Sequence, residues 1–342
     1  MTDTQTLDLD AVGAYLKNHL DGFDGPIEAE KFASGQSNPT FLLKTSQRTV
    51  VLRRKPPGQL LKSAHAVDRE YRVQKALEGS AVPVAKMHLL CEDDSVIGSS
   101  FYVMDHVAGR NFNEPTMDGV SPQDRGAIIG DMNRVLAALH NVDIEQVGLG
   151  DYGPTGNYIE RQVSRWSKQY RASETTAIPA MDRLMDTLKD QMPEDDGQRT
   201  LVHGDYRIDN MIFDADGTDC LAVLDWELST IGHPFADLAS VLMQWQLPAG
   251  REGRGLMGVD RAALGLPSDE AFIESYCQHR GLERVDNLGY YVGFCFFRMA
   301  AIIQGVLKRA LDGNASNPEK AIQIGAFVPM FAENGLRALK KG

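Results

Sequence analysis

The feature that most constrains the fold is a change in sequence texture near Gly109. Residues 27–106 contain short runs of β-branched and aromatic residues separated by turn residues, which is typical of strands. Farther along the chain, apolar residues recur every three to four positions, which is typical of amphipathic helices. This segregation favours an α+β protein with two unequal lobes. We therefore predict one lobe over residues 1–107 and a larger, mainly helical lobe over residues 108–342.

The same patterns predict the order of the elements. The first lobe is expected to hold a mostly antiparallel sheet, with strands at 27–33, 40–45, 48–54, 87–91 and 100–106 and helices at 8–20 and 63–78. The second lobe is expected to begin with a helix that starts at residue 121, followed by helices at 157–171 and 181–191. A strand-rich island at 200–226 comes next, and helices resume from residue 234 to the end. Such an arrangement places short strands in the middle of a helical lobe.

Charge and cysteine content narrow the classes of function. The formal net charge is −12, which argues against nonspecific nucleic-acid binding and against docking on an anionic membrane. The N-terminus lacks the basic and apolar regions of a secretory signal, and the most apolar stretch, 290–307, reads as a buried helix. Reduced thiols in a cytoplasmic protein are expected for the four widely spaced cysteines, Cys91, Cys220, Cys277 and Cys295.

The strand-rich island carries the residues suited to chemistry. It reads LVHGDYRIDNMIFDADGTDCLAVLDWE, and it predicts a strand, a loop and a hairpin. Asp205 and Asn210 then lie on the loop, and Asp225 lies just past the hairpin. Phosphoryl transfer needs a group that orients the attacking hydroxyl and oxygen ligands for Mg²⁺. Asp205 suits the hydroxyl, while Asn210 and Asp225 suit the metal.

The island also resembles a known superfamily. Its H-x-D-x4-N and D-W-E motifs are similar to the catalytic loop and the metal-binding turn of protein-kinase-like enzymes. The H-G-D version resembles the aminoglycoside phosphotransferase and choline kinase branch. The segments LRRKPPGQLLKSAHAVDREYRV, FYVMDHVAGR and LDWELSTIGHPFADLA resemble the kinase-like domain fused to some acyl-CoA dehydrogenases. This resemblance implies a two-lobed protein-kinase-like fold, with ATP and Mg²⁺ as cofactors.

The resemblance assigns roles to residues of the second lobe. It implies that Asp205 orients and deprotonates the acceptor hydroxyl, and that Arg207 lies near the transferred phosphoryl group. His203 would support the loop rather than react. Asp237 is similar to the aspartate that hydrogen-bonds the catalytic-loop backbone.

A nucleotide site is implied in the first lobe. Arg53 stands where the superfamily places a phosphate-contacting lysine, with Glu70 as its salt-bridge partner. A guanidinium can span two phosphate oxygens. The remaining nucleotide-binding positions implied are the single-glycine loop, Ser34, Gly35, Gln36, Ser37 and Asn38, and the interlobe hinge, Met104, Asp105 and Val107.

The acceptor is predicted to be a small molecule. Few residues separate Asp225 from the helix at Pro234, so an activation segment that docks a peptide has no room. The basic segment 157–171 either is a solvated amphipathic helix or lines a site for an anionic acceptor. Candidate acceptor-binding residues are Arg161, Arg165, Trp166, Lys168, Tyr170, Arg171, Glu227 and Arg298. Arg298, in an apolar run, either pairs with a structural carboxylate or faces the acceptor.

The resemblance to the acyl-CoA dehydrogenase-fused domain implies a hydroxyacyl-CoA as acceptor. The alternatives are an aminoglycoside, choline or sugar kinase, or a nucleotide-binding regulatory protein without turnover. The motifs leave the choice between ATP and GTP open, and likewise the oligomeric state.

Overall fold

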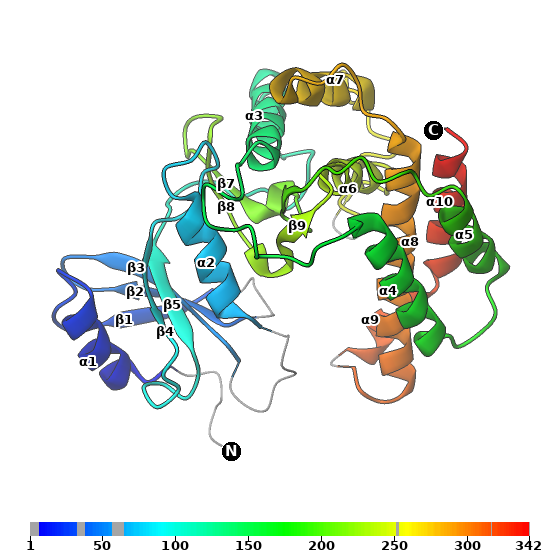
Figure 1. The fold of residues 1–342 in the computed structure, drawn as a ribbon. Helices are drawn as coiled ribbons and strands as arrows, with labels where there is room; N and C mark the ends of the chain where they lie inside the picture. Colours follow the sequence, from blue (N-terminus) through cyan, green and yellow to red (C-terminus); the bar gives the residue numbers. More distant parts are fainter. Residues whose placement is uncertain (1–6, 33–37, 57–64, 251–252, 316, 342) are drawn as a thin grey trace. The chain divides into compact units, whose positions relative to one another are not determined.

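The structure is a computed structural model that describes residues 7–32, 38–56, 65–250, 253–315 and 317–341. A small antiparallel sheet near the N-terminus and a mainly helical remainder confirm the predicted α+β, protein-kinase-like architecture (Figure 1). The chain forms two compact units. The first combines residues up to Phe112 with Ile144–Leu149 and Ile208–Ser229, and the second holds the rest.

The sheet of the first unit follows the predicted strands closely. Its strands are β1 (Glu28–Lys31), β2 (Thr40–Lys44), β3 (Thr49–Arg54), β4 (Met87–Cys91) and β5 (Phe101–Asp105). They pair antiparallel in the order β1-β2-β3-β5-β4. Two helices accompany the sheet, α1 (Leu9–His19) and α2 (Val67–Leu77).

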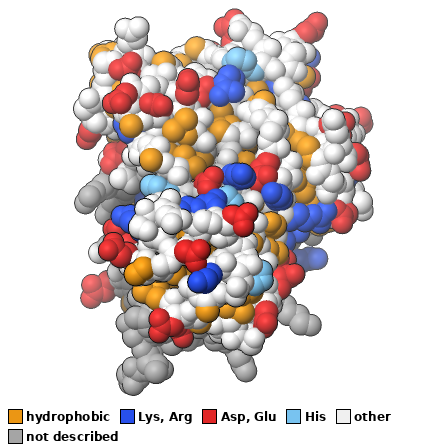
Figure 2. Space-filling view, turned by 90° about the vertical axis from the view of Figure 1, so that its left-hand side faces the viewer, with side chains coloured by type: hydrophobic (Ala, Val, Ile, Leu, Met, Phe, Trp, Pro, Cys, Tyr) orange, Lys and Arg blue, Asp and Glu red, His pale blue; other side chains and the backbone are white. Residues whose placement is uncertain are grey.

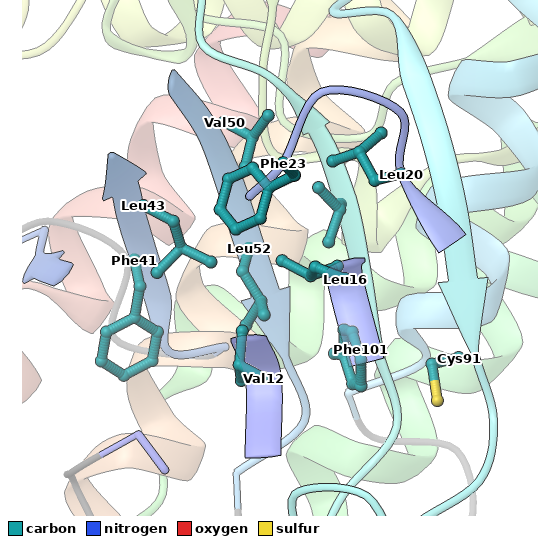
Figure 3. Packing of buried hydrophobic residues seen from close by; sticks show 11 residues of the cluster. Val12, Leu16, Leu20, Phe23, Phe41, Leu43, Val50, Leu52, Cys91 and Phe101 are labelled. Atoms are coloured by element: carbon teal, nitrogen blue, oxygen red, sulfur yellow. The ribbon is translucent and has the colours of Figure 1, made fainter. Parts of the chain in front are cut away.

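Alternation along the strands sorts side chains onto the two faces of this sheet. On one face, Val12 and Leu16 of α1 pack against residues of β2 and β3, including Leu43 and Leu52 (Figure 3). Because successive side chains in a strand point to opposite faces, Arg53 lies on the other face, next to α2. The alternation therefore separates the apolar core from the polar network described below.

A hairpin from the strand-rich island belongs to the first unit. It consists of β7 (Met211–Phe213) and β8 (Cys220–Val223), flanked by the 3₁₀ turns η1 (Ile208–Asn210) and η2 (Trp226–Leu228). Reciprocal backbone hydrogen bonds join Arg110 to Phe213, and the Val223 N–H donates to the Pro83 carbonyl. Because these bonds tie the hairpin to residues 83 and 110, residues 208–229 belong to the first compact unit, although they lie beyond the lobe expected over residues 1–107.

The second unit is built from helices around a two-stranded sheet. β6 (Thr200–Val202) pairs antiparallel with β9 (Thr230–Gly232), a strand that the sequence pattern did not predict. The helices are α3 (Pro122–His140), α4 (Tyr158–Ser173), α5 (Pro179–Asp190), α6 (Phe235–Trp245), α7 (Asp269–Arg280), α8 (Leu288–Leu311), α9 (Pro318–Gly325) and α10 (Val328–Leu339).

Helix α8 is the central helix of the second unit. Among the described residues it alone is long and apolar enough to cross a membrane, but 72% of its most apolar window is buried within the protein. It packs against α4, α6, α9 and α10. This burial identifies α8 as a core helix, as predicted for residues 290–307. The four cysteines are also buried, and none forms a disulfide.

The face shown in Figure 2 carries charges of both signs. Acidic, basic and hydrophobic side chains all appear on this face. This interspersed pattern is the usual one for a protein surface in water.

We expect that Gly109→Ala destabilises the first unit. A Cβ atom at this position would lie 2.6 Å from the Ile212 side chain and closer still to the Phe213 carbonyl oxygen, so the hairpin must shift. The free energy of unfolding, measured by urea denaturation, should fall by about 1–3 kcal/mol. The control is Gly130→Ala on α3, where a Cβ meets nothing within 4 Å and should raise stability slightly. A Gly109→Ala protein as stable as the wild type would contradict this packing.

Candidate active site

A buried arginine organises the polar network of the first unit. The Arg53 side chain is only 10% exposed. Its Nε donates to Glu70 Oε2 at 2.8 Å, and its Nη2 donates to Asp225 Oδ1 at 2.9 Å. Its Nη1 lies 3.3 Å from the hydroxyl oxygen of Thr40. One guanidinium thus links a helix, a strand and the turn that follows β8.

Glu70, the main partner of Arg53, is held by three donors. Its side chain is 1% exposed. Besides Arg53, the Asn38 amide donates to Oε1 at 2.6 Å and the Tyr102 hydroxyl donates to Oε2 at 3.1 Å. Gln74 Nε2 donates to the Glu70 backbone carbonyl oxygen and not to its carboxylate. Such complete hydrogen bonding is what a buried carboxylate requires.

Electrostatics keeps the Arg53 charge in place. Burial by itself would lower the pKa of Arg53, but the charge of Glu70, with smaller contributions from Tyr102 and Asp225, raises this pKa above its ordinary value. Burial raises the pKa of Glu70, and the hydrogen bond and charge of Arg53 oppose that rise. Arg53 is therefore a rigid, permanently charged group, which suits a contact with phosphate.

The two predicted metal ligands occupy the same end of the hairpin. The Leu224 N–H donates to the Asn210 carbonyl at 2.8 Å, which extends the β7–β8 ladder to the residue before Asp225. Asp225 adopts a left-handed conformation with φ of 63°. The next residue, Trp226, is buried and fixes the turn through a hydrogen bond from its indole to the Val223 carbonyl.

The donor types at this end of the hairpin fit Mg²⁺. Asp225 contributes a carboxylate whose side chain is 37% exposed, and Asn210 contributes an amide. Within the described part of the chain, no three His, Cys, Asp or Glu residues cluster as a complete metal site. Mg²⁺ in nucleotide sites takes one or two protein oxygen ligands together with phosphate and water, so two donors are sufficient.

The loop that carries Asp205 lies in the second unit and is fixed by Asp237. The carboxylate of Asp237, on α6, accepts the His203 N–H at 2.6 Å and the Gly204 N–H at 2.9 Å. This is the contact that the family resemblance implies. His140 Nε2 lies 3.4 Å from the same carboxylate, and its Nδ1 lies 2.7 Å from the Tyr276 hydroxyl.

The buried carboxylate of Asp237 stays ionised. Burial alone would raise its pKa, but the contacts with His140 and the His203 N–H outweigh this effect and hold the pKa below its ordinary value of 3.8. Burial lowers the pKa of His140. A charged acceptor that holds two backbone N–H groups gives the loop a defined position.

Two arginines contact the loop that carries Asp205. The Arg207 guanidinium lies 3.6 Å from Asp205 Oδ1, and both side chains are partly exposed. Arg298, on α8, donates from Nη2 to the Gly204 carbonyl at 2.6 Å. The sequence analysis expected a carboxylate or the acceptor as partner for Arg298, and the structure adds a hydrogen bond to a backbone carbonyl.

The other predicted nucleotide-binding residues are placed as follows. Ser34, Gly35, Gln36 and Ser37 lie outside the described residues, and Asn38 is buried behind Glu70. Met104 and Asp105 end strand β5, just before Val107. The Asp105 carboxylate contacts His88 at 2.6 Å, so this side chain takes part in a local polar contact.

The basic residues of α4 divide into two groups. Arg161 binds backbone carbonyls of the loop before the helix, and Arg171 pairs with Glu174 and Asp182. Tyr170 is buried in the core. Arg165 and Lys168 are exposed, and the Arg165 guanidinium lies over the half-buried Trp166 ring at 5.5 Å. Only part of the predicted basic surface is thus open to a ligand.

Comparison with known proteins decides the family. The model of the phosphotransferase enzyme family matches residues 28–283, well over half of the chain. The chain belongs to the phosphotransferase enzyme family.

Glu227, which was predicted to contact the acceptor, lies in η2, the 3₁₀ turn that follows Asp225.

Relatives of this phosphotransferase include parts of longer proteins. The chain is 45% identical over 332 residues to acyl-CoA dehydrogenase family member 10 of Mus musculus, covering 96% of this chain and 31% of that protein. It is 42% identical over 341 residues to family member 11 of Homo sapiens, covering 98% and 43%. The chain therefore spans less than half the length of these relatives.

Solved structures show the same fold. A protein from Ralstonia eutropha, described provisionally as an aminoglycoside phosphotransferase, is 46% identical with a TM-score of 0.90, covering 98% of this chain and 99% of that one. Aminoglycoside phosphotransferase APH(4)-Ia in a ternary complex with AMP-PNP and hygromycin B has a TM-score of 0.63 at 15% identity, covering 96% and 98%. The second similarity shows the fold alone.

The sequence did not reveal the residues that support the site. Tyr102 contacts Glu70, His140 contacts Asp237 and Tyr276 contacts His140, but the sequence analysis assigned a role to none of the three. Tyr102 lies opposite Arg53 in the β3–β5 pair, so the pairing of these two strands would have indicated its place beside Arg53 and Glu70.

We expect the stability contributed by Asp237 to depend on pH. Because the folded-state pKa of this group is depressed, its contribution is present above the ordinary value of 3.8 and is lost as pH falls through the folded-state value. Asp237→Asn should therefore cost about 2–3 kcal/mol near neutral pH, with the difference shrinking below about pH 4. Urea denaturation of both proteins across this range measures the effect, with Asp216→Asn on the exposed hairpin turn as control. A difference that stays constant with pH would contradict the assignment.

Proposed function

We propose that this phosphotransferase moves the γ-phosphoryl group of ATP to a hydroxyl of a small molecule. The observation that carries the proposal is the buried Arg53, which contacts both Glu70 and Asp225. A structural ion pair needs one carboxylate partner. A guanidinium held by one carboxylate and directed at a second, partly exposed one suits a site for phosphate and metal.

The first unit would bind the nucleotide. Arg53 would contact phosphate oxygens, with Glu70 fixing its orientation. Asn210 and Asp225 would hold Mg²⁺ at the end of the hairpin. The metal, when bound, neutralises negative charge on the phosphates.

The second unit would supply the base. The acceptor hydroxyl oxygen would bond to the γ-phosphorus while an Asp205 carboxylate oxygen accepts the hydroxyl proton. The bond from the γ-phosphorus to the bridging oxygen would break, and ADP would leave. The hydrogen bonds from His203 and Gly204 to Asp237 hold the loop in place during this step. Arg207, 3.6 Å from Asp205, would stabilise negative charge on the transferred group.

A hydroxyacyl-CoA is the acceptor that we favour. The names of the mammalian relatives associate this domain with acyl-CoA dehydrogenases. The exposed Arg165 and Lys168 on α4 suit the phosphates of coenzyme A. An aminoglycoside is the second candidate, supported by the description of the 46% identical protein from Ralstonia eutropha.

Replacement of the proposed base tests the reaction. Asp205→Ala should lower the rate of ADP release by ~10²–10⁴ because proton transfer from the acceptor is lost. The assay is a coupled ADP-release screen with Mg²⁺ and ATP over hydroxyacyl-CoAs, amino alcohols, sugars and aminoglycosides. Asp216→Ala, an exposed carboxylate on the hairpin turn, serves as control. A wild-type protein that binds ATP without turnover in every arm would favour a binding module instead.

Charge reversal on α4 tests the acceptor. The double variant Arg165→Glu/Lys168→Glu should raise KM for a hydroxyacyl-CoA about 30-fold, since each reversed charge costs on the order of 1 kcal/mol. KM for ATP should stay unchanged. Lys189→Glu, an exposed residue of α5, makes a charge change of the same sign and half the size away from α4. If the double variant used hydroxyacyl-CoA as well as the wild type does, this acceptor surface would be wrong.

A further inference from the structure

The peptide bond between Gly204 and Asp205 is held at both of its polar atoms. Its carbonyl oxygen accepts a hydrogen bond from Arg298 Nη2 at 2.6 Å. Its N–H, which belongs to Asp205, lies 3.3 Å from His203 Nδ1. The preceding N–H, that of Gly204, donates to Asp237. The residue before the proposed base is thus anchored from α6 on one side and from α8 on the other.

Gly204 makes the second anchor necessary. Its φ of 83° lies in the left-handed region, which glycine adopts without strain. The same freedom allows the peptide plane that follows to rotate while the bond from the Gly204 N–H to Asp237 stays intact. Asp237 therefore fixes the start of the loop but does not determine the direction of the Asp205 side chain.

The position of Arg298 supports a specific role. It stands in the middle of α8, between Phe297 and Met299, where a half-buried guanidinium is costly unless it is hydrogen-bonded. A hydrogen bond from a cation to a carbonyl is shorter and stronger than one between neutral groups. The contact is also long-range, since it joins residues 94 positions apart.

We propose that Arg298 is a positioning residue that sets the orientation of Asp205 by holding the Gly204 carbonyl. This inference rests on the proposed function for the role of Asp205 as base. The anchoring itself is a property of the loop, and it can be measured without turnover. Arg298 acts through the loop backbone and not by binding the acceptor.

Hydrogen exchange tests the anchor directly. In Arg298→Met, the amide of Asp205 should exchange about tenfold faster or more, because its peptide plane loses the carbonyl partner. Peptides covering residues 201–207, followed by mass spectrometry, report this change. Arg309→Met, an exposed residue on the same helix, is the matched control and should leave these amides unchanged. Unchanged exchange in Arg298→Met would overturn the proposal, whether or not the protein has kinase activity.

Turnover tests the consequence for the base. Arg298→Met should lower kcat for ADP release by about 10², as expected for a displaced catalytic group, while KM for ATP stays the same. Arg298→Lys, which keeps one charged donor on a flexible stem, should recover part of the rate. A residue that acts through Asp205 should cost little more in an Asp205→Ala background.

The outcomes separate the two proposals. An equal fold-loss in the wild-type and Asp205→Ala backgrounds would show that Arg298 does not act through Asp205. A lower melting temperature without faster exchange at 201–207 would show a general structural role and would also overturn the proposal. Absence of turnover in the wild type with faster exchange in Arg298→Met would defeat the proposed function and leave the anchor supported.

Discussion

The first unit depends on one buried positive charge. Arg53 lies on a strand between two helices, and an unpaired guanidinium there would cost several kcal/mol. Glu70 compensates this charge, and then Glu70 itself needs donors, which Asn38 and Tyr102 supply. The polar face of the sheet is therefore one hydrogen-bond network, in which Arg53 also contacts the partly exposed carboxylate of Asp225.

The second unit applies the same rule to a negative charge. Asp237 is buried, and its lone pairs are used by the backbone N–H groups of His203 and Gly204. In each unit, hydrogen bonds to neighbouring groups offset the cost of burying a charge, and the same bonds fix those groups in place. The Arg53 guanidinium points toward Asp225, and the Asp237 carboxylate holds the loop that carries Asp205. The cost of burial thus gives each side chain one defined direction, which a functional group requires.

The sequence predicted the parts of the structure that have a period or a motif. Strand alternation placed β2 to β5 within about a residue, and the spacing of Asp205, Asn210 and Asp225 indicated their positions on the loop and the hairpin. The loop residue Asn38 was predicted to contact the nucleotide, but it is a buried partner of Glu70. Its position depends on the packing of α2 against the sheet, which local sequence does not encode.

The basic helix α4 also shows what the sequence could not predict, namely which of its charged side chains are available to a ligand. Its charge count suggested one continuous anionic-ligand surface, but Arg161 is used by nearby carbonyls and Arg171 by nearby carboxylates. A charge becomes available to a ligand only when the fold leaves it without a closer partner, so counting charges along a helix overestimates its binding surface. The family and the fold follow from shared motifs, whereas the acceptor depends on a few exposed side chains such as Arg165 and Lys168. This is why proteins with a TM-score of 0.63 at 15% identity can share the fold while the acceptor must be established for each chain separately.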